Sequence, residues 1–163
     1  MRTTILLFIL LFSLIEVKAQ KLQMSDLMEI MDMPQDKIDT LMRKKSYLLR
    51  QSESDSASRT RYYTSLERNE KEPTWVRSIS IVEVETTRYK GRMFTYRTFS
   101  KQEYNEQLVW LLQHNFKSVG KYNFNNEQHT QYSDGKLRIL VKVKTFPLSG
   151  NKVRRSYELE YGK

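Results

Sequence analysis

The sequence predicts an α+β fold, in which two tandem modules of helix followed by antiparallel strands form one sheet with helices on one face. Three observations lead to this prediction. Residues 100–116 carry a complete helix pattern, and strand-like segments lie on both sides of it. A helix exit at Ser46-Tyr47 recurs at Asn115-Phe116, 69 residues later. The chain has no cysteine, so its core must rest on apolar packing alone.

The central helix is predicted from its start, its face and its end. Ser100 and Glu103 form an S-x-x-E capping box at the start. Asn115 tolerates the left-handed conformation that often ends a helix. The apolar residues between them recur at helical spacing and predict one buried face, which comprises Tyr104, Leu108, Leu111 and Leu112.

Two shorter helices are predicted before residue 46. Ser25-Asp26 is an acceptable cap for a stripe that runs from Leu27 to Met31. Pro34 suits the first turn of a second helix, whose stripe is Ile38, Leu41 and Met42. The cations from Arg43 to Lys45 complement the helix dipole at its end.

About seven or eight strands are predicted for one antiparallel sheet. Those before the central helix are residues 47–50, 59–66, 75–84 and 92–99, with loops at 51–58 and 67–74. Those after it are residues 116–124, 128–132, 137–144 and 157–161, with a hairpin turn at 133–136. Tyr63 and Tyr132 share the 69-residue offset of the helix exits, which indicates an internal duplication. We therefore expect a first module at 20–99 and a second at 100–163.

Residues 1–19 have the features of a secretory signal peptide. Arg2 precedes a short apolar run from Ile5 to Ile15, and Val17-x-Ala19 is the natural cleavage site. The run would extend only about 16 Å as a helix, which is too short for a permanent transmembrane segment. Without a cysteine after the cut, a lipid anchor is excluded. We expect a soluble exported protein, periplasmic or secreted.

Several short motifs resemble those of a group of small exported bacterial proteins of unknown function. They are a leader ending in Ala19-Gln20, then Ser25-Asp26-Leu27, Lys44-Lys45-Ser46-Tyr47, Lys101-Gln102-Glu103-Tyr104 and Tyr132-Ser133-Asp134-Gly135-Lys136. The group commonly has Gly where Ser46 stands, which implies a slightly strained helix exit here. The layout is also similar to that of the beta-lactamase inhibitory protein, whose fold resembles two helix-plus-four-strand modules that form one concave sheet. The group implies no activity.

Cations and aromatic residues are the features that bear on function. Loss of Arg2, Glu16 and Lys18 with the leader would change the net charge from +9 to +8, an excess that attracts anions. Alternation places Arg138, Lys142 and Lys144 on one strand face, with Leu140 among them, and Arg59 and Arg61 on the face of another strand. These six residues are the partner-binding candidates. The plainer interpretation is a solvated basic surface with half-buried strand tyrosines.

We expect no catalytic site, metal or cofactor. His114 suits a helix end, and His129 is expected on an exposed hairpin strand. Glu158 and Glu160 lie on one strand face, about 7 Å apart. Such a pair could serve an inverting glycosidase, although alternation alone also produces it.

The sequence thus favours a non-enzymatic exported module that binds a protein or envelope partner through an open sheet face. The alternatives are a glycan-acting envelope enzyme using Glu158 and Glu160, or a binder of polyanions or anionic lipids. We do not expect nucleic acid as the ligand, because an exported protein rarely meets it. The oligomeric state is not predicted.

Overall fold

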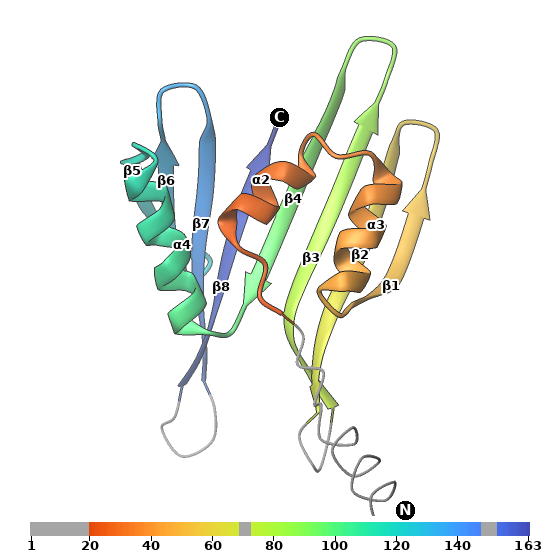
Figure 1. Cartoon of the computed structure of the whole chain (residues 1–163). Helices are drawn as coiled ribbons and strands as arrows, with labels where there is room; N and C mark the ends of the chain where they lie inside the picture. Colours follow the sequence, from red (N-terminus) through yellow and green to blue (C-terminus); the bar gives the residue numbers. More distant parts are fainter. Residues whose placement is uncertain (1–19, 69–72, 148–152) are drawn as a thin grey trace, which may run out of the picture.

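The computed structural model describes residues 20–68, 73–147 and 153–163, and within them it confirms the α+β class (Figure 1). The predicted leader lies outside this part of the chain. The described helices are α2 (Met24–Ile30), α3 (Gln35–Lys44) and α4 (Lys101–Gln113). The strands are β1 (Tyr47–Ser54), β2 (Ser58–Arg68), β3 (Pro73–Glu85), β4 (Lys90–Thr98), β5 (Lys117–Phe124), β6 (Glu127–Ser133), β7 (Arg138–Pro147) and β8 (Val153–Gly162).

All eight strands form one antiparallel sheet in the order β1-β2-β3-β4-β8-β7-β6-β5. The first four strands follow one another, the last four run back in reverse, and β4 pairs with β8 where the two sets meet. At that junction Phe94 lies opposite Tyr161, with ring centroids 5.9 Å apart. Strands β1 and β5 are therefore the two edges of the sheet.

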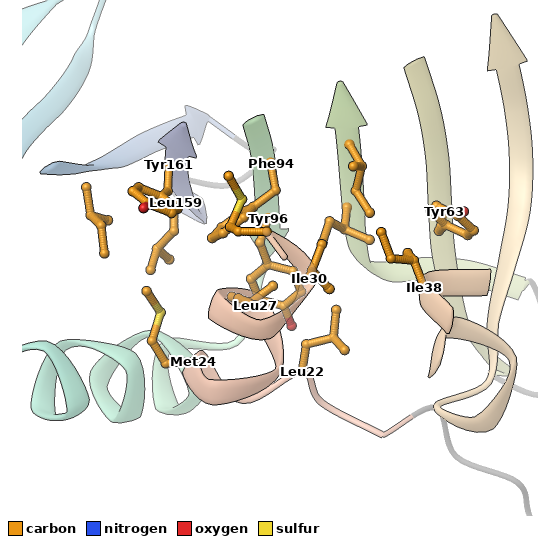
Figure 2. Close-up of a cluster of buried hydrophobic side chains, with 14 of the residues drawn as sticks. Leu22, Met24, Leu27, Ile30, Ile38, Tyr63, Phe94, Tyr96, Leu159 and Tyr161 are labelled. Atoms are coloured by element: carbon orange, nitrogen blue, oxygen red, sulfur yellow. The ribbon is translucent and has the colours of Figure 1, made fainter. Parts of the chain in front are cut away.

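One apolar cluster joins the helices to alternate residues of the strands (Figure 2). Leu27 and Ile30 of α2, for example, lie against the side chains of β4. In Figure 1, α3 is drawn in front of β2 and β3, α2 in front of β4, and α4 in front of β6 and β7. The strand residues in the cluster, which define the inner face, are Tyr47, Tyr63, Ile79, Ile81, Phe94, Tyr96, Ile139, Val141, Leu159 and Tyr161.

Because side chains alternate along a strand, the intervening residues form an outer face that points away from this cluster. The register aligns two rows of residues across β4, β8, β7 and β6 on that face and a third row across β8, β7 and β6. The residues of the first two rows are Thr95, Glu160, Leu140 and Gln131, then Arg97, Glu158, Lys142 and His129. The third contains Ser156, Lys144 and Glu127.

Helix α2 begins one residue before the predicted cap and is fastened to the sheet by an arginine. Its N-cap is Gln23, whose backbone N–H donates to Asp26 Oδ2 at 2.8 Å, so the predicted Ser25-Asp26 cap is wrong. Past its C-terminal end, Arg92 of β4 donates to the carbonyl oxygens of Ile30 and Met33 at 2.5 and 2.6 Å. A cation there satisfies carbonyl groups that a helix leaves unpaired.

Helix α4 follows the prediction in its extent but not in its buried face. Ser100 Oγ accepts from the Glu103 backbone N–H at 3.3 Å, which is half of the predicted capping box. The Glu103 side chain turns inward instead of back to Ser100. The buried residues are Glu103, Gln107 and Leu111, whereas Leu112 is 62% exposed, so its assignment to the core was wrong.

The two helix exits share an unusual backbone conformation. Ser46 after α3 has φ 62°, and Asn115 after α4 has φ 64°. Each is followed by a buried aromatic, Tyr47 or Phe116. The left-handed region ends a helix readily, but it is costly for residues other than Gly and, to a lesser degree, Asn.

Ser46→Gly is therefore expected to stabilise the protein by about 1 kcal/mol, because glycine adopts this φ without steric cost. Asn115→Gly, the matched control, should gain less. Thermal unfolding of both variants measures the difference. An unchanged or lower midpoint for Ser46→Gly would refute strain at this exit.

The segment 51–58, predicted as a loop, is mostly strand. Strand β1 continues to Ser54, and its ladder with β2 ends at the pair Ser54 and Arg59. The turn is short because Asp55 Oδ1 accepts from the backbone N–H groups of Ala57 and Ser58 at 2.7 and 2.6 Å.

None of the helices in the described ranges is both long and apolar enough to cross a membrane.

Candidate interaction surface

The six predicted partner-binding residues lie on two different faces of the sheet. Four of them, Arg138, Leu140, Lys142 and Lys144, alternate with the core residues of β7 and so share the outer face. Arg59 and Arg61 instead lie on the same side of β2 as Tyr63, which packs in the core. The structure thus brings the first four together and separates the other two from them.

Arg61 has a structural contact on the inner face. Its guanidinium donates to both carboxylate oxygens of Asp39 in α3, at 3.0 and 2.8 Å. Tyr63 Oη and Gln35 Nε2 donate to the same carboxylate at 2.5 and 3.0 Å. This cluster fastens α3 to β2 and holds the Arg61 guanidinium against the helix.

The same cluster lowers the pKa of Asp39. Burial alone would raise it, but hydrogen bonds from Tyr63, Arg61 and Gln35 outweigh the burial. Conversely, burial and the neighbouring carboxylate raise the pKa of Tyr63 to about 12. A lowered carboxyl pKa in the folded state means that the ionised form contributes stability above the unfolded pKa.

Asp39→Asn should therefore cost most stability near neutral pH. Its deficit should begin to shrink below about pH 4, where Asp39 of the unfolded chain takes up a proton, and should go on shrinking until the pH has passed the lowered pKa of the folded state. Urea unfolding of both proteins at pH 7, 5 and 3 measures this deficit. A deficit that stays constant over the series would contradict the role assigned to the Asp39 carboxylate.

An ion-pair ladder crosses the outer face from β7 to β4. Lys142 Nζ lies 2.5 Å from Glu160 Oε2 and 3.2 Å from Glu158 Oε1. Glu158 also accepts from Arg97 Nε and Nη2, at 2.9 and 2.5 Å. Partial burial alone would lower the pKa of Lys142, but Glu160 and Glu158 outweigh it and raise that pKa.

The ladder changes how the predicted cations and carboxylates are interpreted. Cations that are partly buried need partners, and β8 of the same chain supplies two acids to Lys142 of β7. Glu158 and Glu160, the candidates for glycan hydrolysis, each hold a cation of the sheet. Lys144 is likewise paired, with Glu127 Oε1 at 2.8 Å, and this hydrogen bond lowers the pKa of Glu127.

Cations nevertheless exceed acids on this part of the outer face. On strands β4, β6, β7 and β8 the cations are Arg97, Arg138, Lys142, Lys144 and Arg154, and the acids are Glu127, Glu158 and Glu160. Within the described residues, Arg138 is exposed and has no ion pair. The Arg154 guanidinium lies 3.7 Å from the ring centroid of Phe99, as a cation over an aromatic face.

His129 is buried, contrary to the prediction of an exposed strand position. It is only 6% exposed, because Tyr122 of β5 stacks on it at 4.9 Å and Phe124 lies edge-on at 6.3 Å. Neither ring nitrogen has a hydrogen-bond partner within the described chain, and the nearest carboxylate oxygen paired with the ring, Glu127 Oε2, lies 3.5 Å from Nε2. His114, by contrast, is exposed at the end of α4, with Nδ1 2.8 Å from the Trp110 carbonyl oxygen.

Two shallow hollows lie elsewhere. One follows α4 and is lined by Lys101, Gln102, Asn105, Glu106 and Val109. The other is at the β5–β6 hairpin, and its lining includes Asn123, Asn126, Gln128 and Arg155. In the part of the chain that the structure describes, no three His, Cys, Asp or Glu residues are grouped as metal ligands would be.

The chain was also compared with family models, curated proteins and solved structures, and none of them matches it.

Proposed function

We propose that this protein is a non-enzymatic interaction module that binds an acidic protein partner through the outer face of strands β4, β8, β7 and β6. The observation that carries this proposal is the excess of cations on that face, with Arg138 exposed and unpaired and the half-buried Leu140 beside it. An apolar residue among cations is the composition of a contact surface more than of a purely solvating one. Positive potential also speeds the encounter with an acidic partner.

The ion-pair ladder supports the proposal in a second way. Lys142 and Arg97 are held in place by Glu158, so less side-chain entropy is lost when a partner contacts them. Carboxylates that already hold cations favour a binding role for the ladder over hydrolysis of a glycan. Binding to polyanions or anionic lipids would use the same cations, but it would weaken steeply with salt, whereas an interface that includes Leu140 would weaken less.

The proposal includes export and an origin by duplication. Cleavage after Ala19 would release a chain that starts at Gln20 and meets its partner outside the cytoplasm. Two modules, 20–99 and 100–163, with helices on one face of the shared sheet, would leave the outer face open. The reversed strand order after β4 and the paired left-handed exits at Ser46 and Asn115 support this duplication.

Site-specific photo-cross-linking in the native host tests the function. A photoreactive residue at position 140 should capture one acidic protein, and the same residue at position 112, which is exposed on α4, should not. Arg138→Ala combined with Lys142→Ala should reduce the yield of that adduct. An adduct pattern at position 140 that equals the pattern at position 112 would refute the proposal.

A further inference from the structure

Strand β5 is an open edge of the sheet with exposed apolar side chains. In the described structure it pairs only with β6. Val119, Tyr122 and Phe124 are 57%, 52% and 60% exposed, although all three are large apolar residues. An edge strand also presents unpaired backbone N–H and C=O groups, which can accept a further strand.

The edge is continuous with the outer face. Tyr122 lies opposite His129, and His129 lies opposite Lys142, so one row leads from β5 into the ion-pair ladder. Tyr122 and Phe124 share this side of β5 and pack against His129. A partner bound to the outer face would therefore reach the free edge without crossing any other element.

The charge of β5 selects among possible strands. The strand contains Lys117 and Lys121 and no acidic residue. Edge lysines discourage pairing with a second copy, because four lysines would meet along one seam. An acidic strand would meet opposite charges instead. The other edge, β1, also exposes Leu48 and Leu49, at 49% each, but carries both Arg50 and Glu53 and has no such preference.

We propose that an extended acidic segment of the partner adds to β5 as a ninth strand. Its backbone would complete the open edge, its acidic residues would lie on the side of Lys121, and its apolar residues would cover Tyr122 and Phe124 on the other side. Lys117, beyond the bulge between Ser118 and Gly120, would add positive charge at the end of the edge. This inference rests on the proposed function, of which it specifies the partner class and the mode of contact. The main-chain bonds would give affinity, and the two lysines would select the acidic strand.

The probe is a capped ten-residue peptide of alternating Glu and Val, with a Lys–Val peptide as its counterpart. Hydrogen exchange of the purified protein, followed amide by amide, should slow along β5 with the Glu–Val peptide and remain unchanged along β1. Lys121→Glu should weaken binding of the Glu–Val peptide by about tenfold or more and strengthen that of the Lys–Val peptide. Lys136→Glu, the same charge change in the exposed β6–β7 turn, should leave both affinities unchanged.

Three outcomes would overturn the inference: protection along β1, equal effects of Lys121→Glu and Lys136→Glu, or self-association through β5 in sedimentation experiments without peptide. Its failure is distinguishable from failure of the proposed function. If β5 stays unprotected while position 140 still captures an acidic protein, the edge inference alone is wrong. If β5 is protected but position 140 captures nothing, the outer-face function is wrong.

Discussion

Glu103→Gln is expected to destabilise the protein by about 3–5 kcal/mol, because it removes the charge of one member of the buried Glu103–Arg77 ion pair. Glu103 and Arg77 are only 7% and 9% exposed, and Arg77 Nε donates to the two Glu103 oxygens at 2.9 and 3.0 Å. The carboxylate also accepts from Thr98 Oγ1 at 3.0 Å and from Tyr96 Oη at 3.2 Å. Urea unfolding measures the loss.

A paired apolar replacement tests the cause of that loss. Arg77→Met combined with Glu103→Leu replaces both members of the pair by apolar side chains and should recover much of the stability. If the double variant were as unstable as Glu103→Gln, the loss of one charge from the buried pair would not be the cause. If Glu103→Gln had no effect, Glu103 would not join α4 to the sheet as described.

Leu111→Ala should cost about 2–5 kcal/mol, as expected for a large core side chain whose loss leaves a cavity. Leu111 is fully buried in the cluster formed by helices and sheet, whereas the next residue, Leu112, is 62% exposed. Leu112→Ala is therefore the matched control and should stay within about 0.5 kcal/mol of wild type. Equal denaturation midpoints for the two variants would contradict the buried face assigned to α4.

Helix α4 shows which features the sequence could predict and which it could not. Its existence, its Ser100 cap and the burial of Leu111 follow from local spacing, which is visible in the sequence. Its inner face also contains Glu103 and Gln107, which apolar periodicity assigns to solvent. Burial of Glu103 depends on Arg77 of β3, 26 residues earlier, and only the fold brings the two together.

For the outer face, too, the sequence predicted one feature and not another. Alternation with Ile139 and Val141 correctly places Arg138, Leu140 and Lys142 on one face of β7. The strand order, which puts β8 and its two glutamates beside Lys142, is not encoded in that pattern.

The inner-face position of Arg61 and the burial of His129 both went beyond what the sequence could predict. Tyr62 and Tyr63 are adjacent, so the sequence gives no reason to prefer one of them for the core, and the face of Arg61 depends on that choice. Burial of His129 requires the register that sets Tyr122 opposite it. Both depend on contacts between strands and not on the residues within one strand.

The central claim is that the outer face is left open by the fold and covered by a partner. Because the chain has no cysteine, thiol labelling of single-cysteine variants tests it directly. Leu140→Cys should react quickly in the isolated protein and slowly in the native host. Two controls should react alike in both settings: Ile139→Cys slowly, because Ile139 is buried, and Leu112→Cys quickly, because Leu112 is exposed. Slow labelling of Leu140→Cys in the isolated protein, or labelling in the host as fast as that of Leu112→Cys, would contradict the claim.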